Sequence, residues 1–211
     1  MPQLPDRLCW SHNHHYHEWM LRQIPARAGR VLDAGCGSGA LARRLAARSA
    51  QVDALDRSEA MIQQARRSGA PGNVHWLHGD LLDPGLTLAP GGYEAVTALA
   101  SLHQMPLQAG LARLAGLVRG GGVLVVVGLY RPATAGDRLT EMLATPANWS
   151  AGAWLALRGR AGKLEEDMPV RAAETTLGDI RAVTAVLLPG LKLRRRLFWR
   201  YSLVWQRPAG R

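Results

Sequence analysis

The residues best suited to binding a ligand follow a short apolar run near the N-terminus. Val31 and Leu32 are typical of the end of a buried strand, and the carboxylate of Asp33 comes directly after them. Glycine, which has no Cβ and lets the backbone lie against a ligand, then occupies alternate positions at Gly35, Gly37 and Gly39. Residues 41–46 follow with an apolar face at helical spacing. Strand, glycine turn and helix N-terminus in this order predict a nucleotide-type site.

Asp33 decides which nucleotide this site favours. Gly35, Gly37 and Ala40 also fit the dinucleotide pattern G-x-G-x-x-G/A, and Asp56 lies about 20 residues further on, where a ribose-binding acid is expected. In a dinucleotide site the loop faces a pyrophosphate, and Asp33 would repel it by on the order of 3 kcal/mol at roughly 5 Å and a dielectric of ~20. S-adenosylmethionine (SAM) carries an ammonium, a sulfonium and no phosphate. The carboxylate therefore favours SAM over a nicotinamide dinucleotide.

Residues 31–39 resemble motif I of class I SAM-dependent methyltransferases, and the segments that resemble the later strands, helices and loops of that family follow in its order. They are residues 52–56, 58–62, 74–82, 93–105 and 111–127. The resemblance covers residues 28–130 and extends to a terminal hairpin. It implies a doubly wound, Rossmann-like α/β fold with a mostly parallel seven-stranded sheet and an antiparallel C-terminal hairpin. It also implies methyl transfer from SAM, with S-adenosyl-L-homocysteine (SAH) as the product.

The resemblance assigns cofactor roles to three acids. Asp33 is expected to meet the methionine ammonium, directly or through water, and the alternative is a turn or capping carboxylate. Asp56 is expected to bind both ribose hydroxyls, and the alternative is a helix cap. Asp80 and the neighbouring Leu81 are expected at the adenine edge, and an exposed loop acid is the alternative. Arg57 stands where the family often has an apolar residue over adenine, and a guanidinium can stack on a purine.

Further cofactor-binding candidates lie around these acids and the glycine turn. They are Tyr16, Cys36, Met61, Ala98 and Leu99. Tyr16 belongs to an N-terminal aromatic segment, and such segments close the cofactor pocket in similar enzymes. The glycines bring backbone close to the cofactor, and a tight turn without a ligand is the alternative.

His103 is the candidate catalytic residue. Methyl transfer requires the protein to align the acceptor, exclude water and, for some acceptors, remove a proton. His103 follows the fourth predicted strand, where related enzymes place groups near the methyl donor. Its imidazole could deprotonate a hydroxyl or amine at neutral pH. A structural histidine bonded to backbone is the alternative, and many members of the family have no dedicated base.

Length and composition favour one cytoplasmic domain. The chain has 211 residues and 47% hydrophobic content, which is enough for one α/β core. It contains neither an apolar stretch long enough to predict a membrane span nor an N-terminal pattern typical of a secretion signal. Cys9 and Cys36 are its two cysteines, and a disulfide would constrain the glycine turn, so a reducing compartment fits better. We expect a monomer or homodimer.

The formal charge of +10 raises a nucleic-acid hypothesis. Nearly all of the positive charge is arginine, which is typical of a GC-rich coding bias. The arginines at positions 43, 44, 48, 66 and 67 are expected to be solvated on outer helix faces. Residues 193–201 mix arginines with aromatics, as nucleic-acid surfaces do. We favour an edge hairpin with solvated arginines, in which Leu197, Trp199 and Tyr201 point inward.

The chain is expected to divide into a short N-terminal part and one larger domain. Residues 1–27 form a helical segment over the cofactor site, with a helix at 18–24 that ends near Pro25. Its histidines at 12, 14, 15 and 17 lack the further ligands of a recognisable metal set, so no metal is predicted. Residues 28–211 form the methyltransferase domain. Within it, residues 130–176 are an apolar insertion, interpreted as a substrate lid and alternatively as a helical patch on the core.

The C-terminal residues of the domain predict a helix and two strands. The sequence does not identify the methyl acceptor. A helix is expected at 176–187 and strands at 191–197 and 199–205. The aromatic insertion favours a small, apolar or aromatic metabolite that is methylated on oxygen, nitrogen or carbon. One alternative is an RNA methyltransferase, and another is a SAM-binding protein without transfer activity.

Overall fold

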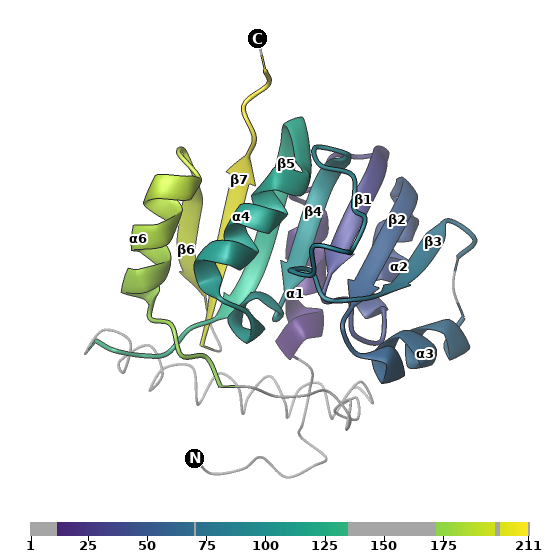
Figure 1. The fold of residues 1–211 in the computed structure, drawn as a ribbon, viewed down its shortest axis with the longest axis horizontal. Coiled ribbons are helices and arrows are strands. Elements are labelled where there is room, and N and C mark those ends of the chain that lie inside the picture. The colour runs from purple at the N-terminus through teal and green to yellow at the C-terminus, as the bar shows by residue number, and fades with distance from the viewer. Residues whose placement is uncertain (1–11, 70, 135–171, 197–198, 211) are drawn as a thin grey trace.

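The computed structural model describes residues 12–69, 71–134, 172–196 and 199–210. Its centre is a seven-stranded sheet in the order β3-β2-β1-β4-β5-β7-β6 (Figure 1). The strands are β1 (Ala28–Ala34), β2 (Ser49–Asp56), β3 (Val74–His78), β4 (Tyr93–Leu99), β5 (Val118–Leu129), β6 (Lys192–Arg196) and β7 (Arg200–Gln206). The first five are parallel, and β7 runs antiparallel to both β5 and β6. The predicted doubly wound fold with an antiparallel C-terminal hairpin is confirmed.

Helices cover both faces of the sheet (Figure 1). One face carries α1 (His12–Leu21), α2 (Ala40–Ala46) and α3 (Glu59–Arg67), and the other carries α4 (Leu107–Leu117) and α6 (Leu177–Leu187). A short 3₁₀ helix, η2 (Leu102–Gln104), follows β4. Each face has its own buried hydrophobic cluster, so the sheet is covered on both sides. This explains why the run from Val123 to Val127 is continuously apolar.

Two helix starts follow directly from the sequence. Ser58 caps α3 by accepting a hydrogen bond from the Met61 backbone N–H. Thr176 and Asp179 form a reciprocal capping box at the start of α6, with Asp179 Oδ2 2.8 Å from the Thr176 backbone nitrogen. In both helices the capping residue and its partner are three positions apart in the chain. The helix predicted from residue 176 is confirmed at Leu177–Leu187.

Two predicted boundaries are wrong. The N-terminal helix is α1, from His12 to Leu21, rather than residues 18–24. Tyr16 and Met20, one turn apart, are both buried against the core, and this packing draws the preceding polar residues into the helix. The fifth strand begins at Val118, whereas the resemblance implies a turn at residues 120–122 before this strand. Its register to β4 shifts where residues 119–122 bulge out.

The arginines of α2 and of the turn after it were expected to be solvated. The structure instead shows them in contact with neighbouring elements. Arg44 forms an ion pair with Glu18 of α1, and Arg48 donates from Nη1 to the Leu21 carbonyl at 2.9 Å. Arg43 donates to the Ser38 carbonyl at 2.8 Å and lies over the Trp76 ring. These contacts hold α1 and the glycine turn against α2.

The C-terminal hairpin also differs from its prediction. β6 is the edge strand, whereas β7 lies inside the sheet and is covered on both faces. Arg194 and Arg195 are exposed as expected, but Arg200 is buried. Trp199 and Tyr201 pack into the clusters on opposite faces rather than side by side. Leu197, Phe198 and most of the predicted insertion, residues 135–171, lie outside the described residues.

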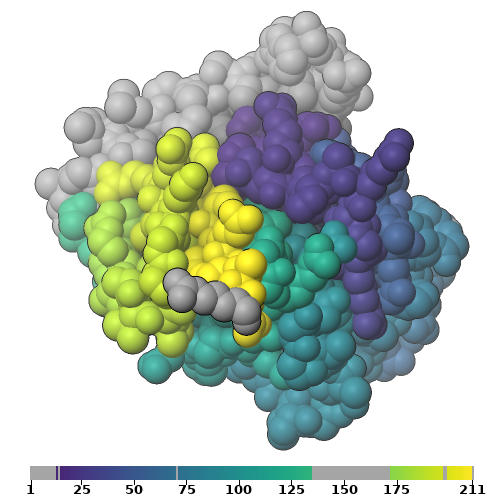
Figure 2. Space-filling view, turned by 90° about the horizontal axis from the view of Figure 1, so that it is seen from above, coloured from purple at the N-terminus to yellow at the C-terminus, as the bar shows by residue number. Residues whose placement is uncertain are grey.

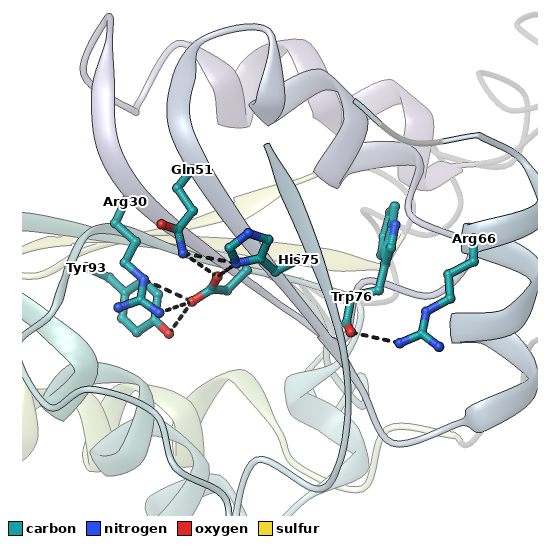
Figure 3. Close-up of polar contacts among 7 residues, drawn as sticks. Arg30, Gln51, Arg66, His75, Trp76 and Tyr93 are labelled. Atoms are coloured by element: carbon teal, nitrogen blue, oxygen red, sulfur yellow. Dashed lines mark hydrogen bonds and ion pairs between the residues drawn. The ribbon is translucent and has the colours of Figure 1, made fainter. Parts of the chain in front are cut away.

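A buried acid that sequence reasoning overlooked joins three strands. Asp53 of β2 accepts from Arg30 Nη2 of β1 at 2.7 Å and from the Tyr93 hydroxyl of β4 at 2.8 Å. Figure 3 shows Arg30, Gln51, His75 and Tyr93 pointing toward one another at this position. Burial raises the pKa of Asp53, but hydrogen bonds from Gln51, Tyr93 and Arg30 and the Arg30 charge outweigh it, so the net pKa is lowered. The cluster fixes the strands that carry the site.

No helix in the described part of the chain is both long enough and apolar enough to cross a membrane.

Candidate cofactor site

A cavity of about 160 Å³ lies where β1, β2 and β4 end. Its walls come from the glycine turn after β1, the turns after β2 and β3, and the segment from Leu99 to Pro106. The predicted cofactor residues that line it are Gly35, Gly37, Asp56, Arg57, Met61, Asp80, Leu81 and Leu99. Open parallel sheets bind ligands at this edge. Residues far apart in the sequence thus meet around one space.

Five predicted cofactor residues do not line this cavity. They are Tyr16, Asp33, Cys36, Gly39 and Ala98. All five are buried. Sequence reasoning had not singled out Ser101, Gln104, Met105 and Pro106, which form one wall. Their position after β4 was the available signal, because the fourth strand ends beside the glycine turn.

The glycine turn is shaped for close approach. Gly35 and Cys36 donate their backbone N–H groups to the Leu55 carbonyl, at 2.7 and 2.9 Å. Gly35 has φ +80°, and a Cβ there would lie 2.3 Å from the Cβ of Ser101. Gly37 has φ +54°, and a Cβ there would meet no described atom within 4 Å. Gly35 is therefore required for packing, whereas Gly37, which lines the cavity, has open space where a Cβ would lie.

Asp56 is fixed by two backbone groups. Its Oδ2 accepts from Gly37 N–H and its Oδ1 from Ser58 N–H, each at 2.8 Å. The carboxylate therefore fixes the turn that leads into α3 and anchors the glycine turn at the same time. Each oxygen keeps a lone pair for a further donor. Asp56 can thus bind a diol at the cavity wall while holding the loop in place.

Asp33 lies beneath the turn and is 1% exposed. Its Oδ1 is 2.8 Å from the Thr97 hydroxyl, and its Oδ2 has no hydrogen-bond partner in the described structure. Burial raises the pKa of Asp33 to about 7, with a lowering effect from Thr97 and a raising effect from the nearby Asp56 charge. Buried carboxylate oxygens are normally paired. The orphaned oxygen fits a cationic group, which is what SAM would supply.

The adenine end of the predicted site carries Arg57 and Asp80. Arg57 is exposed and donates from Nη2 to Gln104 Oε1 at 2.7 Å, across the cavity mouth. Asp80 is exposed too, and its Oδ1 accepts from the Leu82 backbone at 2.8 Å. Asp80 is thus an exposed acid in a loop, and it also forms part of the cavity wall.

His103 lines a second cavity of about 230 Å³ rather than the first. This cavity lies between η2, residues 174–175 and Tyr201 of β7. Residues 104–106 contribute to both cavities, so the two spaces share a wall. The arrangement places an imidazole beside the predicted cofactor site but not inside it.

Tyr16 packs behind the glycine turn. It is 4% exposed, contacts His15 edge-on, and belongs to the same hydrophobic cluster as Cys36. Burial raises the pKa of Tyr16 to about 12, against the lowering effect of Arg200 and Arg196. Its contribution to the site is to hold α1 against the turn.

Comparison with known proteins identifies the class of protein to which this fold and cavity belong. A family model described as a methyltransferase domain matches residues 31–122. An uncharacterized methyltransferase of Mycobacterium tuberculosis is 34% identical over 205 residues, covering 95% of this chain and 98% of that protein. The chain therefore belongs to the class I SAM-dependent methyltransferase family, and it is a SAM-dependent methyltransferase.

Other relatives match only part of the chain or share the fold. A malonyl-[acyl-carrier protein] O-methyltransferase of Enterobacter lignolyticus is 34% identical over 58% of this chain and 46% of its own length. A ubiquinone biosynthesis O-methyltransferase of Bordetella bronchiseptica is 35% identical over 49% of this chain and 44% of its own length. A solved structure from Listeria monocytogenes, titled a putative SAM-dependent methyltransferase, has a TM-score of 0.63 at 14% identity, covering 93% of this chain and 99% of that one.

Proposed function

We propose that the chain transfers a methyl group from SAM to an oxygen of a small-molecule acceptor. The observation that carries the proposal is the shared wall formed by residues 104–106, which places a second cavity containing His103 next to the predicted cofactor cavity. A transferase needs two adjoining spaces, one for the donor and one for the acceptor. A protein that only binds SAM needs one.

The residues around the first cavity suit the parts of SAM. The orphaned Oδ2 of Asp33 suits the methionine ammonium, directly or through water. The fixed carboxylate of Asp56 suits the ribose hydroxyls. Asp80 and Leu81 suit the adenine edge, and the guanidinium of Arg57, which lines the same cavity, suits the face of the ring. When bound, SAM supplies an electrophilic methyl carbon, whose bond to sulfur breaks as the bond to the acceptor forms.

In this proposal His103 removes the proton of an acceptor hydroxyl. An imidazole is partly neutral near pH 7 and can accept a proton there. The side chains of Leu102, Met105 and Leu107 line the second cavity beside His103 and supply apolar contacts for an acceptor. The partial relatives named O-methyltransferases support oxygen as the nucleophile.

Calorimetry tests the donor site. We expect the wild-type protein to bind SAM and SAH and not NADH, because Asp33 repels a pyrophosphate. Asp33→Asn and Asp56→Ala should each weaken SAM binding roughly tenfold or more, as expected for charge-assisted hydrogen bonds. Asp83→Asn changes an exposed acid that does not line the cavity and is the control. Tight NADH binding without SAM binding would exclude the proposal.

A transfer assay tests the acceptor. Radiolabelled SAM is offered with phenols, anilines, thiols and total RNA. We expect label on phenols, with kcat reduced in His103→Gln and KM for SAM unchanged. Labelled RNA, with binding that weakens steeply as salt rises, would replace the small-molecule proposal with the RNA alternative.

A further inference from the structure

A buried arginine with two unsatisfied nitrogens stands at the start of β7. Arg200 is 8% exposed, and its Nε and Nη1 have no hydrogen-bond partner in the described structure. No acidic side chain in the described ranges forms an ion pair with it. Buried arginines are rare unless paired, because removing the charge from water is costly. Burial lowers the pKa of Arg200 to about 10, so it remains protonated at neutral pH.

The neighbouring residue presents another unused donor. Trp199 Nε1 is also buried without a hydrogen-bond partner among the described residues. Successive strand residues normally point to opposite faces. Trp199 instead has φ +56° and packs into the cluster on the α1 face, the face on which Arg200 also lies. The left-handed backbone thus brings three N–H donor atoms to one face. Strained backbone of this kind collects at functional sites.

These donors stand at the sheet edge that carries the cofactor cavity. Arg200 pairs with Leu129 at the carboxyl end of β5. Leu99 of the cavity wall pairs with Val127 of β5, and Val127 in turn pairs with Ser202 of β7. Arg200 is therefore two strands and two residues from Leu99, about 10 Å across the sheet and about 7 Å along it. The two offsets combine to about 12 Å between backbone positions, a distance that the Arg200 side chain and a single-ring acceptor can span together.

Apolar side chains connect the donors to the cavity. Leu99 lines the cavity and packs into the same cluster as Tyr16 and Trp199. Figure 2, seen from the opposite end of the sheet, shows the N-terminal residues (purple) next to the C-terminal ones (yellow). The guanidinium carbon of Arg196 lies 4.4 Å from the centroid of the Trp19 ring, and Arg196 Nε donates a hydrogen bond to the Ser202 hydroxyl. The surroundings are aromatic and positively charged, with no balancing carboxylate among the described residues.

We propose that Arg200 binds a carboxylate of the methyl acceptor, assisted by Trp199 Nε1, so that the enzyme acts on acidic, apolar or aromatic small molecules. This inference rests on the proposed function, because it names the substrate class. It adds to the second cavity, which Tyr201 lines from the α4 face of the sheet, an anchoring point on the α1 face of β7. Arg200 is a substrate-binding residue that orients the acceptor toward the cofactor cavity. A carboxylate accepts from several donors at once and neutralises a buried guanidinium, which a neutral acceptor cannot do.

A purely structural Arg200 makes a different prediction. Its long stem would then serve only as packing between α1 and the sheet. In that case methionine would replace it without loss, and the site would not distinguish an acid from its amide. The charge preference of the site therefore separates the two roles.

The test uses matched acid and amide probes on the SAH-loaded protein. Benzoate is compared with benzamide, and hexanoate with hexanamide, by tryptophan fluorescence and calorimetry. We expect each acid to bind roughly tenfold or more tighter than its amide, in line with a charge-assisted hydrogen bond. Arg200→Met should abolish the preference and Arg200→Lys should restore part of it. Arg194→Met changes an exposed arginine of the edge strand and should change nothing.

The outcomes separate this inference from the function on which it rests. If the wild-type protein binds SAH but binds acids and amides equally, the carboxylate site is wrong and the donor site stands. An unchanged preference in Arg200→Met excludes Arg200 as its source. If the wild-type protein binds neither SAM nor SAH, the proposed function itself fails. If Arg200→Met does not fold, the wild-type comparison still tests the carboxylate site, and Arg200→Lys, which keeps the charge but not the guanidinium, tests the residue.

Discussion

Arg57 and Gln104 are hydrogen-bonded across the mouth of the cofactor cavity, with Arg57 Nη2 2.7 Å from Gln104 Oε1. Arg57 follows β2 and Gln104 ends η2, which follows β4. Strands β2 and β4 are the two neighbours of β1, so this bond passes over the glycine turn that lies between them. Both residues line the cavity. A ligand held there leaves more slowly while the bond is intact.

Removing this bond should shorten the residence time of SAM. One exposed hydrogen bond is worth about 1 kcal/mol, so Gln104→Ala should raise the dissociation rate about fivefold and leave association nearly unchanged. Stopped-flow displacement of SAM by excess SAH measures both rates. Arg66→Ala is the control, because Arg66 is exposed and bonds the Trp76 carbonyl away from the cavity mouth (Figure 3). Equal dissociation rates in Gln104→Ala and wild type would contradict the bridging role.

SAM binding should weaken as pH falls through about 7. The pKa of Asp33 in the ligand-free protein is about 7, and only the carboxylate form attracts an ammonium. Below this pH each binding event must first displace a proton, so affinity should fall by up to about tenfold per pH unit. Calorimetry between about pH 5.5 and 7 tests this linkage. The loss should disappear in Asp33→Asn.

Methylthioadenosine is the matched ligand for the same titration. It shares the adenosine part of SAM and lacks the ammonium, so its affinity should stay constant over this pH range. A parallel loss for both ligands would assign the titration to another group.

The same carboxylate should cost the ligand-free protein stability. A raised pKa means that the folded state favours the protonated form. The stabilising contribution is therefore complete below the ordinary value of 3.8 and is lost as pH rises through about 7. The difference between these values corresponds to about 4 kcal/mol. Asp33→Asn should thus be more stable than wild type at about pH 8, by up to this amount, and the gain should shrink at about pH 5.5.

Urea unfolding of both proteins at the two pH values measures this difference. A gain of equal size at both would mean that the buried charge is not its cause. A variant that is stabilised yet binds SAM poorly is the expected signature of a residue kept for function.

The fold and part of the candidate cavity wall could be predicted from local patterns. The glycine turn, the acid after the second strand and the run from Val123 to Val127 are each legible within a few neighbouring residues. The bond between Arg57 and Gln104 was not, because it joins residues 47 positions apart in the chain. The side that His103 faces depends on how η2 packs, which no periodicity encodes.

The sequence also did not predict which charged side chains are buried. Arginine is a solvated residue by type, and the composition of the hairpin predicts a solvated edge. Arg200 is buried because β7 inserts between β5 and β6 and α1 covers that face. Asp53 is likewise buried by partners on two other strands. Both facts depend on strand order, which is set by tertiary packing rather than by residue type.

The two glycines of the turn should respond differently to alanine. A Cβ at Gly37 meets open space on the cavity side, so Gly37→Ala should fold, at a cost of about 1–2 kcal/mol for its left-handed backbone. Its methyl group would occupy cofactor space and weaken SAM binding. A Cβ at Gly35 would lie 2.3 Å from Ser101, so Gly35→Ala must displace the strand end and lose roughly 3 kcal/mol or more.

Urea unfolding and SAM calorimetry on the two variants measure both effects, and Gly116→Ala is the control. Gly116 lies in α4, outside the cavity, and a Cβ there meets no described atom within 4 Å. Because alanine suits a helix better than glycine does, Gly116→Ala should be slightly stabilised and bind SAM as wild type does. If Gly37→Ala bound SAM with unchanged affinity, the open space beside Gly37 would not be where the cofactor lies, and the donor site would have to be moved away from the glycine turn.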